Sequence, residues 1–148
     1  MQLWRATLAD TDALAAIRRD AILGLTTPVL TRQQAARWAL DAPPDRFVRA
    51  VRDHAVWLAV ELQPVGWVEV DGDHIAALYV SPAHASRGVG SVLLAHAEAT
   101  IRCAGALVAS LEASPNALPF YLRRGYHPRG APDADGAWPL HKLLICGR

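Results

Sequence analysis

Residues 78–94, which read LYVSPAHASRGVGSVLL, decide the fold of this chain. Residues 78–82 end an apolar strand at a proline, and residues 87–94 open a helix that begins with two glycines. Glycine permits backbone conformations that turn several N–H groups toward one point, and the first turn of a helix adds unpaired N–H donors and a positive dipole end. A strand joined to a helix by such a loop indicates an anion-binding site for a group such as a diphosphate.

Other phosphate-binding motifs do not fit this loop. A dinucleotide fingerprint requires a third glycine at the position of Leu93, and a nucleotide P-loop requires Lys and then Ser or Thr after the last glycine. Arg87 directly precedes the first glycine, where a guanidinium can contact phosphate oxygens as a bidentate donor. Alternatively, Gly88 and Gly90 only allow a tight entry into a buried helix.

Hydrophobic periodicity divides the rest of the chain into elements. The first third is mainly helical after a short strand over residues 3–7, with helices expected over residues 7–22, 31–42 and 46–51. Consecutive strands are then predicted over residues 56–60, 65–70 and 75–80. A helix over residues 88–103, a strand over 107–111, a helix over 115–124 and a closing strand over 141–146 complete the prediction.

Length and composition limit the class of protein to which this chain can belong. The 148 residues suit a single domain over residues 1–148, and 52% hydrophobic with 20% charged residues is typical of a globular chain without a membrane span. A net charge of +1 does not favour nucleic acid, and the six histidines and two cysteines show no metal-ligand spacing. The N-terminus lacks the features of a secretory signal. We therefore expect a cytoplasmic protein without a metal, acting on a small molecule or a peptide.

A second motif lies in residues 111–126, which read LEASPNALPFYLRRGY. Together with the glycine loop it resembles the GNAT superfamily of acetyl-CoA-dependent N-acetyltransferases, in which a strand, an Asn-containing helix start and a Phe-Tyr pair precede Gly and an aromatic residue. The superfamily signature is Gln or Arg, two residues, Gly, any residue, then Gly or Ala. Residues 88–90 match its second half, whereas Ala85 occupies its first position, so one phosphate contact is missing or comes from Arg87.

The resemblance covers nearly all of the chain and implies its fold and cofactor. The expected fold is α/β (α+β), with a mixed, mostly antiparallel sheet of six to seven strands flanked by about four helices. The sheet is expected to open in a V between the strands that end at Val80 and near Leu111, with acetyl-CoA in the opening. The cofactor-binding residues that the resemblance implies are Leu78, Tyr79, Val80, Arg87, Gly88, Val89, Gly90, Ser91, Asn116 and Tyr121. A homodimer is also expected.

The chemistry is expected to be attack of a primary amine on the thioester in a ternary complex. The departing thiolate has a pKa of about 8.5 and a phenol one of about 10, so Tyr121 can act as general acid. The base is ambiguous, because Glu69 and His74 both lie on central strands that could face the cleft. Trp38 and Trp67 are candidates for the wall of the acceptor pocket.

The sequence is also compatible with two further interpretations. A non-catalytic acyl-CoA-binding module would keep the fold and the glycine loop without transferring the acetyl group. An enzyme of this kind could also acetylate a protein N-terminus or lysine instead of a small amine. The sequence does not identify the acceptor.

Overall fold

The computed structural model describes residues 1–24 and 31–144. These contain one seven-stranded sheet with the strand order β1-β2-β3-β4-β5-β7-β6. The strands are β1 (Gln2–Arg5), β2 (Ala55–Val60), β3 (Pro64–Asp71), β4 (His74–Val80), β5 (Val108–Ala113), β6 (His127–Pro128) and β7 (Trp138–Leu143). The helices are α1 (Thr11–Leu23), α2 (Arg32–Ala39), α3 (Arg46–Asp53), α4 (Val89–Cys103) and α5 (Leu118–Leu122), with 3-10 turns at Leu8–Asp10 and Pro82–His84.

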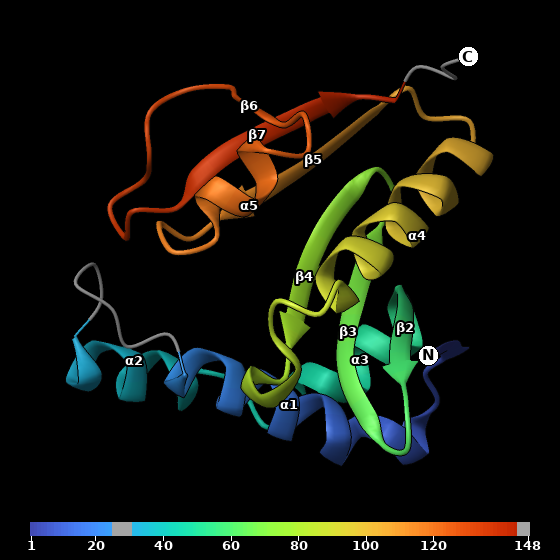
Figure 1. Cartoon of the computed structure of the whole chain (residues 1–148), viewed down its shortest axis with the longest axis vertical. Coiled ribbons are helices and arrows are strands. Elements are labelled where there is room, and N and C mark those ends of the chain that lie inside the picture. Colours follow the sequence, from blue (N-terminus) through green and yellow to red (C-terminus); the bar gives the residue numbers. More distant parts are fainter. Residues whose placement is uncertain (25–30, 145–148) are drawn as a thin grey trace.

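The sheet opens between β4 and β5, as the sequence predicts. Every other neighbouring pair is antiparallel, whereas β4 and β5 are parallel and meet only through the pairs His74↔Ser110 and Ile75↔Leu111. Beyond Ile75 the two strands diverge, so β5, β7 and α5 form a separate upper part in Figure 1. Within the described residues, the edge of β4 from Ala76 to Val80 therefore has no strand partner on that side.

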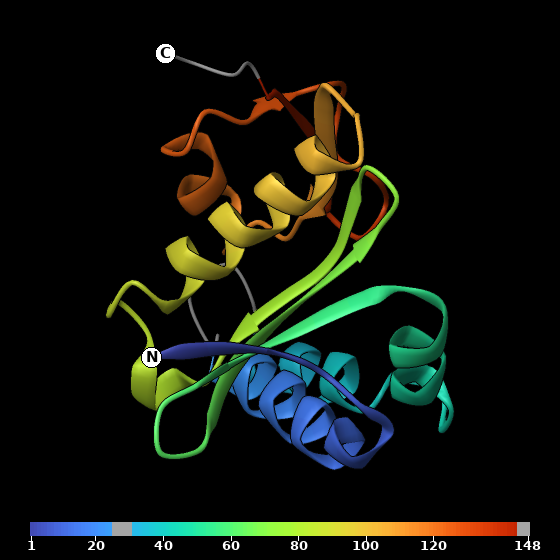
Figure 2. The same ribbon diagram turned by 90° about the vertical axis from the view of Figure 1, so that its right-hand side faces the viewer.

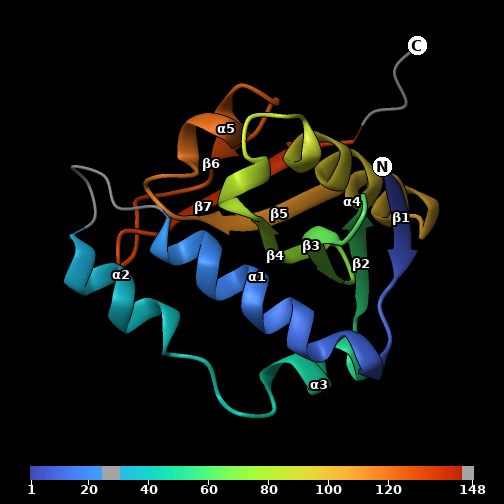
Figure 3. The same cartoon turned by 60° about the horizontal axis from the view of Figure 1, so that its bottom comes forward.

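Helices cover both faces of the sheet. Figure 3 shows α1, α2 and α3 together on one side of the strands, and Figure 2 shows α4 on the other side. The core under α1 and α3 includes Leu14, Ile17, Ala50, Trp67 and Ala77. The core under α4 includes Val68, Val70, Val89, Leu93, Ala97, Ile101, Leu111 and Leu140. Because this second core joins residues of β3, β5 and β7, α4 packs across both halves of the opened sheet.

Local sequence signals account for several boundaries. Thr31 caps α2 in a reciprocal capping box, in which its hydroxyl accepts from the Gln34 N–H and the Gln34 side chain accepts from the Thr31 N–H. Gly72 has a φ of 65° in the tight turn between β3 and β4. This is the left-handed region that glycine adopts without the steric cost of a Cβ.

The predicted elements and fold class are confirmed, with three differences. There are five α-helices in the described residues instead of about four. The last one begins at Leu118 and not at Pro115, because the Ser114 hydroxyl accepts from the Ala117 N–H and closes a turn before the helix. The closing strand is Trp138–Leu143, pairs with the unpredicted β6, and ends before Cys146, which lies outside the described residues.

Every helix in residues 1–24 and 31–144 is too short or too polar to span a bilayer.

Candidate active site

A cleft of about 560 Å³ lies along the unpaired edge of β4. Its walls are the last three residues of β4, the loop into α4, and one side of α5 with the turn that precedes it. Leu78, Tyr79 and Val80 all line it, as the sequence predicts. The cleft occupies the space that the divergence of β4 and β5 leaves open.

The glycine loop forms the end of the cleft near α4. Gly88 is the N-cap of α4 with a φ of 84°, and Ser86 also has a positive φ, of 64°. A Cβ on Gly90 would lie 3.3 Å from the Phe120 ring, so this glycine allows α5 to pack closely against the start of α4. Gly88, Gly90 and Ser91 line the cleft, and the first N–H groups of α4 lack intrahelical partners by the geometry of a helix.

Two residues of the predicted phosphate loop do not reach the cleft wall. Val89 is buried in the core beneath the loop. Arg87 is exposed and is not among the residues that line the cleft. The sequence prediction that Arg87 replaces the absent first residue of the signature therefore lacks support from its position.

Arg123 and Arg124 carry the charge of this cleft instead. Among the described residues that line it, these two are the only charged ones. Arg124 donates through Nε and Nη2 to the Ser91 Oγ, at 3.1 and 2.5 Å, and through Nη1 to the Phe120 carbonyl at 2.9 Å. Its Cζ lies 3.7 Å from the centroid of the Phe120 ring. The cleft is thus positive and contains no carboxylate.

Tyr121 lies where the large cleft meets a second, smaller cavity of about 90 Å³, and it lines both. Its side chain is buried at 7% exposure and contacts the rings of Phe120 and Tyr126 edge-on. Burial, and then the neighbouring Tyr79, raise the pKa of Tyr121 above its ordinary value, with a smaller opposing effect of Arg124. The phenol is therefore protonated throughout the neutral pH range.

The smaller cavity extends from Tyr121 toward the junction of β4 and β5. Its walls are mostly apolar and include Trp38, Ile75 and Leu111, with Glu112 as its one charged residue among those described. Trp38 lines the large cleft as well, which agrees with a position in an acceptor wall.

His74 lies behind this cavity, in contact with β5. Its Nδ1 is 2.8 Å from the Ser110 Oγ and its Nε2 is 3.4 Å from Glu112 Oε1. His74 does not line the cavity itself, but its partner Glu112 does. The pair places a carboxylate and an imidazole together at the closed end of the V.

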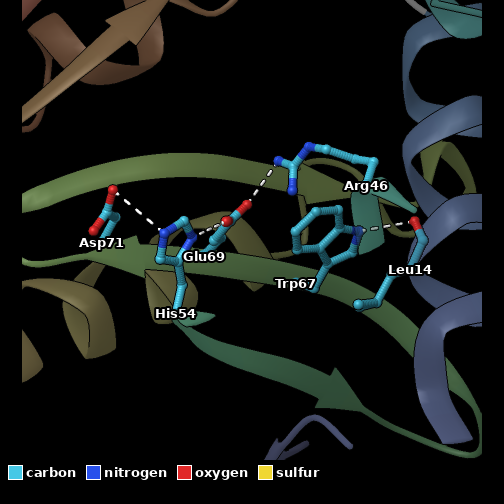
Figure 4. Close-up of polar contacts among 6 residues, drawn as sticks. All are labelled: Leu14, Arg46, His54, Trp67, Glu69 and Asp71. Carbon is cyan, nitrogen blue, oxygen red and sulfur yellow. Dashed lines mark hydrogen bonds and ion pairs between the residues drawn. The ribbon is translucent and has the colours of Figure 1, made fainter. Parts of the chain in front are cut away.

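Glu69 lies on the opposite side of β4 from β5, in a buried polar cluster (Figure 4). Its carboxylate accepts from Arg46 Nη2 at 2.7 Å and contacts His54 Nδ1 at 2.5 Å, while His54 Nε2 lies 3.4 Å from Asp71. Glu69 is 1% exposed and lines neither cavity. As a candidate base it is therefore poorly placed, because the chain itself occupies both of its oxygens.

Trp67 and Asn116 also differ from their predicted places in the site. Trp67 is fully buried, donates its indole N–H to the Leu14 carbonyl at 3.1 Å, and lines neither cavity, so it is a core residue (Figure 4). Asn116 lies in the turn between Ser114 and Ala117, which both line the cavities, but it is not itself a lining residue.

Sequence reasoning missed Arg124, Ser110 and Glu112. Arg124 follows a helix and precedes a glycine, a pattern that indicates only a helix terminus. Its contact with Ser91 joins residues 33 positions apart, which no local pattern reveals.

Comparisons with known proteins show the family to which the chain belongs. A family model described as "Acetyltransferase (GNAT) domain" matches residues 26–140. The chain therefore belongs to the GNAT family of acetyltransferases. YafP of Escherichia coli K12, named an uncharacterized N-acetyltransferase, is 30% identical over 132 residues, which cover 87% of this chain and 84% of YafP.

Another relative matches a shorter region of this chain. YjaB of Salmonella typhimurium LT2, named a peptidyl-lysine N-acetyltransferase, is 30% identical over 92 residues, or 60% of this chain. The match spans about 61% of the length of that relative.

Solved structures show the same fold. A GCN5-related N-acetyltransferase from Rhodopseudomonas palustris superposes with a TM-score of 0.89 at 28% identity, covering 97% of this chain and 95% of the other. PaiA N-acetyltransferase from Thermoplasma acidophilum, solved in complex with coenzyme A, gives a TM-score of 0.78 at 18% identity and covers 97% and 99%.

Proposed function

We propose that this chain transfers the acetyl group of acetyl-CoA to a primary amine by direct attack in a ternary complex, with Tyr121 as the general acid. The observation that carries this proposal is the position of the Tyr121 side chain, which borders both the large cleft and the smaller cavity. Two reactants that enter from the two cavities meet at this residue. Family membership supports the acetyltransferase reaction.

The large cleft fits acetyl-CoA. The unpaired edge of β4 offers the backbone groups of Leu78 and Val80 to the pantetheine arm, which can lie there as an added strand, whereas the Tyr79 carbonyl faces β3. The glycine loop offers N–H groups to the diphosphate, and no carboxylate of the lining opposes it. Asn116 is proposed to hydrogen-bond the same arm from the turn before α5. The Val80 N–H is the proposed oxyanion donor.

Tyr121 suits proton donation to the departing thiolate. Tyr121 is protonated at neutral pH, so its O–H can hydrogen-bond to the sulfur as negative charge develops there. The burial that raises its pKa makes it a weaker acid, and the positive charge of Arg124 acts in the opposite direction. The edge-on contacts with Phe120 and Tyr126 hold the Tyr121 ring in place.

We place the base at the closed end of the V. The attacking amine must lose a proton, and the carboxylate of Glu112 in the wall of the smaller cavity, with His74 at 3.4 Å behind it, can accept it. His74 thus takes part in the proposed base as the partner of Glu112, whereas the oxygens of Glu69 are occupied by Arg46 and His54.

The shape of the smaller cavity favours an amine on an unbranched alkyl chain. Its volume of about 90 Å³ and its apolar walls suit a few methylene groups, and Glu112 suits the positive charge of the amine. A lysine side chain of a peptide has this form, and the YjaB relative is named a peptidyl-lysine N-acetyltransferase. We therefore propose a peptidyl lysine or a small alkylamine as acceptor. A cytoplasmic location and a homodimer stay predictions from the sequence.

Thiol release from acetyl-CoA tests this function. The purified chain is given acetyl-CoA with an N-terminally blocked lysine peptide, the same peptide with norleucine in place of lysine, or a small diamine. We expect turnover with lysine or diamine and none with norleucine. Tyr121→Phe should lower kcat about 100-fold or more and leave CoA affinity within about threefold, because a general acid contributes about 10²–10⁴ to rate.

The control outcomes separate the alternatives. CoA binding without turnover for any amine would support a non-catalytic binding module instead. An unchanged kcat in Tyr121→Phe would remove Tyr121 from the chemistry.

A further inference from the structure

We propose that Arg124 binds the diphosphate of CoA and supplies the charge that the GNAT signature places at the position of Ala85. This inference rests on the proposed binding of acetyl-CoA in the large cleft. Arg124 follows α5 in the chain, whereas the signature loop precedes α4, so the contact would come from a different element of the fold.

The guanidinium of Arg124 is fixed at the start of α4 before any ligand binds. Nε and Nη2 donate to the Ser91 Oγ, Nη1 donates to the Phe120 carbonyl, and the Phe120 ring packs against the guanidinium face at 3.7 Å. Ser91 lies in the first turn of α4, the same turn whose N–H groups face an anion in such loops. A donor held in this way loses little conformational entropy on binding.

Donors remain for a ligand after these contacts are made. Arginine has five N–H donors, and the three described bonds leave one on each terminal nitrogen. The Ser91 hydroxyl accepts from Arg124, so its own hydrogen can point to a third oxygen. Two guanidinium donors and a hydroxyl beside a helix N-terminus match the oxygens of a diphosphate.

The charge of Arg124 is not neutralised within the described part of the chain. All of its described polar contacts are with neutral groups, and it takes part in none of the ion pairs among residues 1–24 and 31–144. The described residues that line the cleft include no Asp or Glu. A half-buried cation in a cleft without an anion is poised for an anionic ligand.

The other arginines of this region are less suitable. Arg87 is exposed and does not line the cleft. Arg123 lines the cleft but is exposed. A role limited to tying α5 onto α4 would explain the contacts of Arg124 with Ser91, but such a role predicts no dependence on the phosphates of the ligand.

Calorimetric titration with three ligands tests the proposal: CoA, dephospho-CoA, which lacks the 3′-phosphate, and pantetheine, which lacks every phosphate. The variants are Arg124→Gln, Arg87→Gln and, as a matched charge control, Arg102→Gln in the last turn of α4. We expect Arg124→Gln to weaken CoA and dephospho-CoA alike, by about 10- to 100-fold, and pantetheine by less than about twofold. Arg102→Gln should bind all three like the unaltered protein, and Arg87→Gln should lose less than about threefold.

Each other outcome overturns the inference. If Arg124→Gln binds CoA with unchanged affinity, or loses as much affinity for pantetheine as for CoA, then Arg124 only holds α5 against α4. If Arg124→Gln loses affinity for CoA but not for dephospho-CoA, Arg124 contacts the 3′-phosphate instead of the diphosphate. Failure of the unaltered protein to bind CoA refutes the proposed function and not this contact in particular.

A second variant covers the case in which Arg124→Gln does not fold. Arg124→Lys keeps the charge and the aliphatic stem but lacks the planar fork. It should lose about 3- to 10-fold for CoA and dephospho-CoA and nothing for pantetheine. Wild-type affinity for CoA in this folded variant would contradict the bidentate contact.

Discussion

Glu69 is a buried charge and Arg124 is a half-buried one, and their surroundings differ. Glu69 is enclosed under α3 and has a guanidinium and an imidazole as partners. Arg124 lies in the open cleft, and its hydrogen-bond partners in the described part of the chain are a hydroxyl and a carbonyl. When the partners of a buried charge all come from the chain, removing that charge leaves them unpaired and destabilises the fold, whereas a charge with neutral partners in a cleft is available to a ligand.

The largest effect that tests this comparison is expected at Glu69. Glu69→Gln leaves Arg46 and His54 without their shared anion, and loss of one member of a buried pair typically costs about 3–5 kcal/mol. Because both partners are partly exposed, we expect the free energy of unfolding in urea to fall by about 2–3 kcal/mol. The kcat per folded molecule should change less than about threefold.

Asp71→Asn is the matched control for this variant. Asp71 contacts the same His54 but is 58% exposed, so the change should cost less than about 0.5 kcal/mol. A Glu69→Gln protein with normal stability and a hundredfold lower kcat would reverse our assignment and make Glu69 the base.

A smaller effect, on rate and not on stability, is expected at His74. His74→Ala should lower kcat/KM about 30- to 100-fold at pH 7, because the proposed Glu112–His74 base loses its imidazole. The deficit should shrink as pH rises toward the pKa of the free amine, since a neutral amine needs no base. Full pH profiles of kcat/KM for both proteins measure this.

Ser110→Ala provides the comparison for His74. It removes the hydroxyl next to His74 Nδ1 without removing the imidazole, so the loss should be less than about fivefold. A deficit in His74→Ala that is constant from pH 6 to 9 would argue for a structural role.

The smallest effect on stability is expected at His96 on α4. Among the described residues it has no carboxylate partner, whereas His54 has Glu69 and Asp71. The His96 Nε2 is buried without a hydrogen-bond partner among the described residues, and its ring packs edge-on to Trp57 at 4.3 Å. Burial lowers the pKa of His96. The unfolded chain therefore binds more protons near pH 6, and this site makes the folded state less stable as pH falls below about 6.5.

His96→Phe keeps the ring contact and removes the titration. We expect it to reduce the loss of unfolding free energy between pH 7.5 and 5.5 by less than about 1 kcal/mol, as measured by urea denaturation at each pH. An identical pH slope in the two proteins would show that His96 is not desolvated in solution.

Much of the fold could be predicted from local patterns. The change from helical to alternating periodicity near residue 55, the Pro82 stop and the glycine entry to α4 each depend on residues close in sequence. The start of α5 was misplaced because the hydroxyl of Ser114 closes a turn there and does not cap the helix. The two-residue strand β6 is too short to give any periodicity.

The site was harder to predict, because its decisive contacts join distant residues. Strand alternation can place Glu69 on a face but cannot show that Arg46 and His54, 23 and 15 residues away, occupy its carboxylate. Arg87 precedes the glycines directly, so the sequence predicts that it contacts phosphate. In the structure, Arg87 does not line the cleft. Tyr121 was predictable only through the family resemblance.

The narrow junction of β4 and β5 has a mechanical consequence. The outer half of the sheet is attached to the inner half at the narrow end of the V, by two backbone pairs and by the packing of α4. A ligand that lies along the free edge of β4 and touches α5 spans both halves at the wide end. A bound ligand would therefore connect the two halves at the end where strand pairing does not connect them.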